Sequence, residues 1–304
     1  QLSDNFVEEF ARRLVDSVSE QGGCDFVRDL SIKLPLAAIC EMFGVPTEDW
    51  YQIFLWSETL FGSHDPEFMV EGETPEQTSR RASDEFFGYI GALVERRKAE
   101  GAEGPDLVSA LIRGRVDGKA LSDKEIYDHI FLMLAAGNET TRNATTGGVI
   151  ALLQNPDQRD LLCAHPELLE SAVEEMLRWT TPVIQFMRTA VSDFELRGTT
   201  IRAGESVGLF YPSANRDEDV FAEPYRFDIT RSPNDHLAFG GFGAHFCLGA
   251  NLARWELRGI MRALLRILPE MELAGEPARM VNGHVGSIKH LPVTYRPAPR
   301  REGI

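Results

Sequence analysis

The sequence predicts a mainly α-helical protein with small β-sheets, an α+β fold, in one domain covering residues 1–304. Apolar residues recur at three- and four-residue spacing through most of the first two-thirds of the chain. Short β-branched runs separated by turns then occupy residues 183–209. The chain of 304 residues is 43% hydrophobic and shows no repeat or linker, so it is long enough to bury one large core.

The helices follow from this periodicity and from start and stop signals. Gly44 and Gly62 each close an apolar-periodic segment. Ser122 and Glu125 form a capping-box pattern ahead of the longest periodic stretch, which should cross the interior. Residues 63–79 are polar and broken by prolines, which predicts a surface loop. The main predicted helices are 6–20, 31–44, 46–62, 79–100, 122–153, 167–179 and 248–268, with a further short one before residue 167.

Strands are predicted in the last third of the chain. Turns at Arg197-Gly198 and Ala203-Gly204 divide the β-branched runs of 183–209. An irregular stretch rich in proline and aspartate leads from there to a glycine-rich loop. The tail "VGSIKHLPVTY", residues 285–295, also has a β-like composition.

Composition excludes several classes of function. The net charge of −16 and the pI near 4.9 argue against nucleic acid or an anionic membrane as a partner. We expect no transmembrane segment, because no uninterrupted apolar run is long enough, and the first residues do not look like a signal peptide. The four cysteines are scattered without a CxxC pair, which predicts the reducing cytoplasm.

One cysteine has unusual surroundings, in the stretch "LAFGGFGAHFCLGANLARWE" at 237–256. A lone cysteine is usually a small buried hydrophobe. Here Gly240, Gly241 and Gly243 remove side chains before Cys247, so that a flat ligand can approach. The helix that starts after Gly249 presents free N–H groups, which stabilise a thiolate. Such a thiolate suits an axial haem ligand.

Other chemistries for this loop fit less well. Structural zinc needs four nitrogen or sulfur ligands, and no second Cys/His pair stands at usable spacing. A phosphate-binding loop would end in Gly-Lys-Ser/Thr, which is absent. A nucleophilic pair of Cys247 and His245 stays open, although a partner two residues away would be unusual.

The loop resembles the haem-binding signature of the cytochrome P450 monooxygenases, Phe-Gly-x-Gly-x-His-x-Cys-x-Gly. The matching residues are Gly241, Gly243, His245, Cys247 and Gly249. An extra glycine places Phe239 one residue too far upstream, and Phe242 is expected to fill part of its packing role. The resemblance implies haem b, with Cys247 as the iron ligand. It begins part-way into the family's domain, so the P450 fold is expected to lack its N-terminal sheet and first helices.

The middle of the longest predicted helix carries a second motif. Gly137 costs about 1 kcal/mol in a helix interior, and polar side chains between apolar turns invite unsatisfied burial. A functional interpretation is that Gly137 lets a small ligand approach and that a threonine hydroxyl makes a slight kink. Residues 136–141, from Ala136 to Thr141, match the oxygen-activation motif of the P450s. The resemblance implies that Glu139 and Thr140 relay protons to dioxygen.

Two further sets of residues are assigned by the resemblance. Glu175 and Arg178 lie on one helical face, where an ion pair ordinarily contributes little. In the family they join an arginine of a Pro-x-Arg-Phe segment, here Arg226, behind the cysteine loop. Arg188 and His245 are implied partners of the haem propionates. The implied substrate pocket, whose members are equally compatible with plain core, is Met133, Leu134, Ala135, Val183, Ile184, Phe186 and Val285.

The resemblance implies hydroxylation of an unactivated C–H bond with O2. Electrons would come from NAD(P)H through a ferredoxin reductase and a ferredoxin, docking near Arg254 and Arg258. The segments "FGGFGAH" and "GSIKHLPVTY" are most similar to bacterial hydroxylases of steroid side chains, methyl-branched lipids and terpenoids. Two alternatives are a peroxide-driven haem-thiolate enzyme and a haem-free, non-catalytic fragment.

Overall fold

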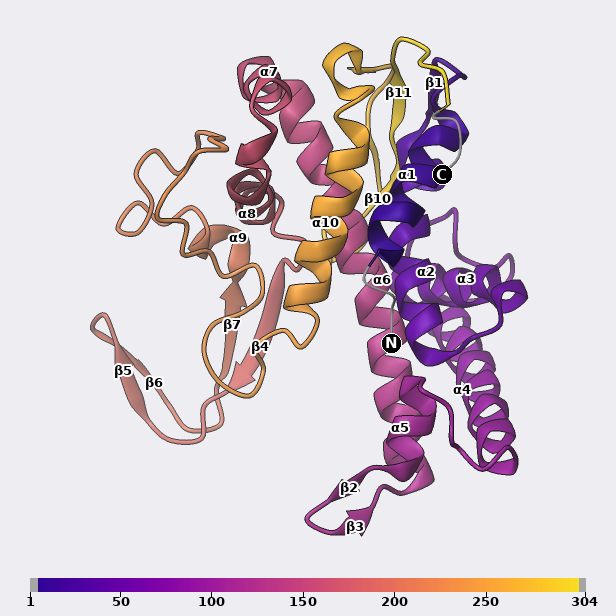
Figure 1. Ribbon diagram of the computed structural model, residues 1–304. Coiled ribbons are helices and arrows are strands. Elements are labelled where there is room, and N and C mark those ends of the chain that lie inside the picture. The colour runs from indigo at the N-terminus through magenta and orange to yellow at the C-terminus, as the bar shows by residue number, and fades with distance from the viewer. Residues whose placement is uncertain (1–4, 301–304) are drawn as a thin grey trace.

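A computed structural model describes residues 5–300, and the predicted domain of 1–304 extends beyond them at both ends. Most described residues from 5 to 180 are helical (Figure 1). The α-helices are α1 (Phe6–Val18), α2 (Lys33–Phe43), α3 (Trp50–Phe61), α4 (Pro75–Ala99), α5 (Leu107–Arg113), α6 (Asp123–Gln154), α7 (Pro156–Ala164), α8 (Leu169–Thr180), α9 (Tyr211–Ala214) and α10 (Ala250–Leu264). Short helical turns are η1 (Val27–Ser31), η2 (Thr47–Asp49), η3 (Pro166–Leu168) and η4 (Leu268–Glu270).

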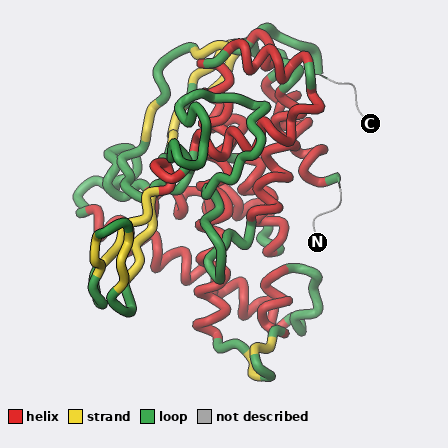
Figure 2. The backbone as a smooth tube through the Cα atoms, turned by 90° about the vertical axis from the view of Figure 1, so that its left-hand side faces the viewer, coloured by secondary structure: helices red, strands yellow, loops and turns green. Residues whose placement is uncertain are grey.

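The strands form small antiparallel sheets. They pair as β1–β11–β8, β10–β9, β2–β3, β4–β7 and β5–β6. Figure 2 shows the longer strands and loops gathered along one side of the helices. The strands are β1 (Gly23–Asp25), β2 (Arg115–Val116), β3 (Lys119–Ala120), β4 (Gln185–Thr189), β5 (Phe194–Leu196), β6 (Thr199–Ile201), β7 (Ser206–Phe210), β8 (Glu272–Leu273), β9 (Ala278–Arg279), β10 (Ile288–His290) and β11 (Pro292–Thr294). The α+β prediction is therefore confirmed.

Helix α6 runs through the middle of the molecule (Figure 1). The predicted capping box is confirmed, since the Ser122 N–H donates to Glu125 at 2.7 Å and the Glu125 N–H to Ser122 Oγ at 3.3 Å. The helix packs against α2, α3 and α4 and also against α8 and α10. It thus contacts both the N-terminal helices and the helices next to the cysteine loop.

The two ends of the described chain meet. Gly23 of β1 pairs with Thr294 of β11. Helix α1 also packs closely on α10, where a side chain at Gly259 would lie 2.6 Å from Val7 Cγ1. The C-terminal elements that follow the cysteine loop are therefore fixed by the first helix. None of the described helices is long and apolar enough to cross a bilayer.

Several boundaries differ from the predictions. Helix α4 begins at Pro75, because Thr74 and Gln77 form a capping box and proline is well tolerated in the first turn. Helix α10 starts at Ala250, two residues later than expected. The sequence did not predict α5 or the β2–β3 hairpin, which are too short to carry a clear period.

Candidate active site

The cysteine loop turns directly into helix α10. The Cys247 N–H donates to the Phe239 carbonyl at 3.0 Å, and Gly249 is the N-cap of the helix. Gly240 (φ 84°) and Gly243 (φ 106°) adopt the left-handed conformation that favours glycine. Burial raises the pKa of the Cys247 thiol above its ordinary value, and a hydrogen bond from the Gly249 N–H and the charge of Arg254 offset this only in part. The loop therefore holds a half-buried thiol at a helix N-terminus, as predicted.

The surface around this thiol is apolar and unshielded within the described part of the chain. Phe242 is fully exposed, and Leu248 and Phe246 are 88% and 51% exposed. Gly241 and Gly249 have ordinary backbone angles, yet an added Cβ at either would meet no atom within 4 Å. Residues 5–300 thus give no steric reason for these two glycines. A flat apolar ligand lying against the loop would supply one.

Phe239, rather than Phe242, packs the loop from behind. The Arg254 guanidinium lies 4.5 Å from the centre of the Phe239 ring. Two hydrogen bonds of 2.7 and 2.8 Å fix Arg254 on Glu174, a residue of α8. Burial would raise the pKa of Glu174, but hydrogen bonds from His236 and Arg254 outweigh it and lower the pKa to about 2. The Gly240 turn absorbs the extra residue and leaves Phe239 in place, while Phe242 is fully exposed, and the packing role expected of Phe242 stays a prediction.

Glu139 lies in a fully buried polar network. Its Oε1 accepts hydrogen bonds from Arg142 (2.5 Å), Asn143 (2.9 Å) and Ser287 (2.6 Å). Arg142 also contacts Glu58 of α3. The other oxygen of Glu139, Oε2, has no partner in the described residues. The structure shows no hydrogen bond between Glu139 and its predicted relay partner Thr140.

Thr140 and Gly137 lie on other faces of α6. The Thr140 hydroxyl donates to the Ala136 carbonyl at 2.9 Å, and its side chain is half-buried. Helix α6 nevertheless continues unbroken through these residues. A Cβ on Gly137 would lie 3.3 Å from Ile39 Cδ1 of α2. Close packing of α2 on α6 therefore gives Gly137 a structural reason that the sequence analysis did not foresee.

The Glu175–Arg178 pair is completely buried and holds an irregular loop. Two hydrogen bonds of 2.7 Å join the side chains. Arg178 also donates to the carbonyls of Asn215 (2.8 Å) and Pro224 (2.9 Å). These two backbone groups belong to the loop that precedes the cysteine segment. The predicted role of the pair as a lock behind the loop agrees with this geometry.

The third arginine of this network is Arg231, which corrects the prediction of Arg226. Arg231 Nε donates to Glu175 at 3.2 Å, and its side chain is only 9% exposed. It also donates to the carbonyls of Ala222 and Arg226. The side chain of Arg226 instead forms an exposed pair with Glu223. The loop turns between these two arginines, so that Arg226 contributes its carbonyl and Arg231 its charge.

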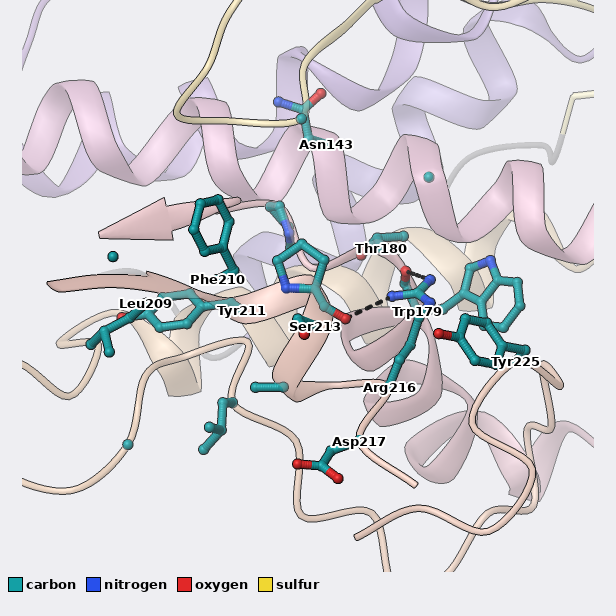
Figure 3. Close-up of a pocket in the computed structure, with 18 of the residues that line it drawn as sticks. Asn143, Trp179, Thr180, Leu209, Phe210, Tyr211, Ser213, Arg216, Asp217 and Tyr225 are labelled. Atoms are coloured by element: carbon teal, nitrogen blue, oxygen red, sulfur yellow. Dashed lines mark hydrogen bonds between the residues drawn. The ribbon is translucent and has the colours of Figure 1, made fainter. Parts of the chain in front are cut away.

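A cavity of about 1320 Å³ opens between α6, α8, α9, strand β7 and the cysteine loop. Figure 3 shows Trp179, Arg216 and Tyr225 at one end of it, with Leu209 and Phe210 at the other. Arg216 donates to the Trp179 carbonyl at 2.8 Å. Arg188 and Arg279 add two exposed guanidinium groups to the lining. The cavity therefore joins the cysteine loop to a basic and aromatic surface.

Comparison with known proteins decides the family. The cytochrome P450 sequence profile matches residues 51–163 and 162–269. A methyl-branched lipid omega-hydroxylase of Mycobacterium tuberculosis is 44% identical over 293 residues, which are 95% of this chain and 67% of that protein. A steroid C26-monooxygenase of Rhodococcus jostii is 42% identical over 95% of this chain and 59% of its own length.

The chain belongs to the cytochrome P450 family.

Solved P450 structures show the same fold. A Mycobacterium marinum P450 in complex with pseudoionone aligns with a TM-score of 0.89 and 39% identity, covering 95% of this chain and 69% of that one. A Bacillus megaterium P450 in complex with corticosterone gives a TM-score of 0.84 and 33% identity, covering 95% and 77%. The chain spans about two thirds of the length of the M. tuberculosis relative and less of the R. jostii one. The P450 fold is thus shown for the part of the family's length that this chain represents.

The cofactor of the P450 family is haem b with a cysteine thiolate ligand, and the residues of this P450 fit it. Cys247 has a backbone N–H donor and an apolar, unshielded surface beside it. Arg188 and His245 are both exposed, so the carboxylate groups of a haem can reach them. Among residues 5–300, no carboxylate forms an ion pair with Arg188, whose only hydrogen bond goes to the neighbouring Met187 carbonyl. These observations agree with the site predicted from the sequence.

The predicted substrate residues are dispersed. Leu134 and Val285 are buried in the core, and Ala135 is only 8% exposed. Val183 forms a β-bridge with Val285, and Phe186 packs edge-on against His284. Met133 and Ile184 are partly buried. None of the seven lines the cavity of this P450 within the described chain, and Phe186 is 41% exposed.

Sequence reasoning missed Glu58, Arg142, Arg231 and Glu256. Arg142 shares the face of Glu139, three residues away, which is a signal that the periodicity offered. Glu58 lies on another helix, and only the packing of α3 on α6 brings it there. Glu256 of α10 is buried with no charged partner among residues 5–300, and burial raises its pKa to about 8.

Proposed function

We propose that this P450 inserts one oxygen atom of O2 into an unactivated C–H bond of a bulky apolar substrate, such as a steroid side chain, a methyl-branched lipid or a terpenoid. The observation that carries the proposal is the Cys247 thiol, held at a helix N-terminus beside an unshielded apolar surface. The substrate class is supported by relatives named for methyl-branched lipids and for steroids, which are 40–44% identical.

The residues of the chain divide the work. Haem bound at Cys247 supplies the oxidising chemistry, which a thiolate ligand favours. The Gly249 N–H and the positive charge of Arg254 both favour deprotonation of Cys247. Arg188 and His245 hold the anionic edge of the cofactor. Phe242, Phe246 and Leu248 exclude water from its face.

Proton delivery is assigned to two side chains of α6. Thr140 carries a hydroxyl at the half-buried surface of the helix, and Glu139 has one unpartnered carboxylate oxygen. Adjacent residues of a helix point to different faces, so bound water beside Glu139 Oε2 must connect Glu139 to Thr140. The proton passes from the Glu139 carboxyl group through that water to Thr140 Oγ1.

Electrons come from NAD(P)H through a ferredoxin reductase and a ferredoxin. Arg258, on the helix that follows the cysteine loop, is the better candidate for docking an acidic carrier. Arg254 is already fixed on Glu174, so its charge is partly neutralised. The cytoplasm stays the predicted compartment, in agreement with four cysteines that form no disulfide.

The first test is the visible spectrum of the reduced protein with carbon monoxide, recorded after expression with a haem precursor. We expect the Soret band of a thiolate-ligated haem, and we expect Cys247→Ser to lose it. A parent protein that takes up no haem would favour the non-catalytic alternative. A parent with an imidazole-type Soret band would refute the assignment of Cys247.

The second test separates the dioxygen route from the peroxide route. Thr140→Ala should lower the product formed per NADH consumed, because protons then reach the site without control. An unchanged ratio of product to NADH would contradict the relay.

Product analysis with cholest-4-en-3-one, phytanic acid and linalool tests the substrate class. Binding of small polar substrates alone would contradict the proposed class of bulky apolar substrates.

A further inference from the structure

A buried group of three charged side chains joins α3 to α6. Glu58, Glu139 and Arg142 have side chains that are 3%, 0% and 0% exposed. Arg142 contacts both carboxyl groups, with one guanidinium nitrogen directed to each. The reaction proposed above makes no use of Glu58, so the burial of its carboxyl group requires a separate explanation.

The charges of this group do not balance. Two ionised carboxylates and one guanidinium would leave a net charge of −1 in the protein interior. An uncompensated buried charge is expensive, and proteins normally avoid it by protonation. The charged groups that act on Glu58 are Arg142 and Glu139, both from α6. No cation beyond Arg142 pairs with either carboxyl group in the described residues.

Hydrogen-bond donors indicate which carboxyl group is neutral. Oε1 of Glu139 receives three donors, from Arg142, Asn143 and Ser287. Glu58 receives one donor, from Arg142. Donors stabilise the ionised form, so the negative charge belongs on Glu139. Oε2 of Glu139 has no hydrogen-bond donor in the described residues, and the O–H group of a protonated Glu58 can supply one.

We propose that Glu58 and Glu139 share one proton beside Arg142, and that Glu58 is the positioning residue from which Glu139 receives the proton that it passes on in each turnover. Burial and the proximity of Glu139 raise the pKa of Glu58, which agrees with this geometry. The role of this proton in turnover rests on the proposed function of Glu139. The existence of the shared proton is independent of that function.

The transfer is balanced within the pair. At rest the proton is on Glu58 and Glu139 is a carboxylate. When the reaction draws a proton toward Thr140, the O–H bond of Glu58 breaks and a new O–H bond forms at Glu139 Oε2, from which the proton then moves to the connecting water. Glu58 becomes a carboxylate, which Arg142 neutralises. Glu58 then recovers a proton from water at the α3 side of the network, and no further reactant is required.

Infrared spectroscopy of the purified protein tests the shared proton without measuring activity. At neutral pH the parent should show two carboxylic-acid carbonyl bands that shift on labelling with ¹³C-glutamate, one from Glu58 and one from Glu256. Glu256→Gln is the matched control, because it removes a buried neutral carboxyl group remote in sequence from the pair. We expect it to remove one band and leave the other.

Either single substitution in the pair should remove the remaining band. Glu58→Gln deletes the protonated group itself. Glu139→Gln leaves Glu58 alone with Arg142, so Glu58 should ionise and its band should disappear although Glu58 is still present. Retention of the band in Glu139→Gln would overturn the proposal, because Glu58 would then be neutral through burial alone. Absence of the band from the parent at neutral pH would overturn it equally.

A kinetic measurement then separates this inference from the proposed function. Glu58→Gln should lower kcat by at least about tenfold, with KM and the substrate-induced spectral shift unchanged. A purely structural role would change substrate binding as well, and that outcome would refute the positioning role. If the infrared bands behave as expected but Glu139→Gln turns over normally, the shared proton stands and the relay of the proposed function fails.

Discussion

The side chain of Arg231 should be worth several kcal/mol to the stability of this P450. It donates to the buried carboxylate of Glu175 and to three loop carbonyls, those of Ala222, Glu223 and Arg226. Arg231→Ala removes one charge from a buried network and leaves these acceptors partly unpaired. Loss of one partner from a buried ion pair costs about 3–5 kcal/mol. Because the side chain is 9% exposed and Arg178 still holds Glu175, we expect about 3 kcal/mol.

Urea unfolding followed by circular dichroism measures this loss, and Arg226→Ala is its matched control. Arg226 has the same side chain, but its pair with Glu223 is exposed. Exposed pairs contribute at most about 1 kcal/mol, so Arg226→Ala should shift the free energy of unfolding by less than that. Equal losses in the two variants, or a larger loss for Arg226→Ala, would refute the assignment of the third arginine.

Three further predictions concern α10 and its N-cap, Gly249. Burial raises the pKa of Glu256 from 4.5 to about 8, so the folded state retains a proton that the unfolded state releases. The free energy of unfolding should therefore fall as the pH rises from about 4.5 to about 8, and Glu256→Gln should remove this slope in urea titrations. Gly259→Ala should cost about 1–3 kcal/mol, because its Cβ would clash with Val7. Gly249→Ala meets no protein atom, so it should leave the stability of the haem-free protein unchanged while lowering its retention of haem in a transfer assay.

Local patterns predicted those parts of the fold and site that depend on nearby residues. The capping box at Ser122 and the turn at Arg197-Gly198 require only adjacent side chains and backbone angles, and both are found. Cys247 at a helix N-terminus also followed from its own neighbours. Each of these features is fixed within a few residues, which is the range that a single sequence reports.

Features that depend on tertiary packing were not predicted. The contact of Ile39 with Gly137 exists only because α2 crosses α6, and no period in either segment encodes it. Arg231 was missed because its partner, Glu175, lies 56 residues earlier. Leu134 and Val285 have apolar side chains, which suit a substrate pocket and a protein core equally well. Only their neighbours decide between the two.

The loop between α9 and α10 is fixed through its carbonyl groups. Arg178 and Arg231 donate to the backbone of Asn215, Pro224, Ala222, Glu223 and Arg226. A carbonyl is present whatever the side chain, so most replacements at positions 222, 223 and 226 preserve these bonds. Saturation mutagenesis should therefore find wide freedom of substitution at these three positions and almost none at the arginines themselves. These three positions of an irregular segment can thus vary in sequence while the cysteine stays in its place.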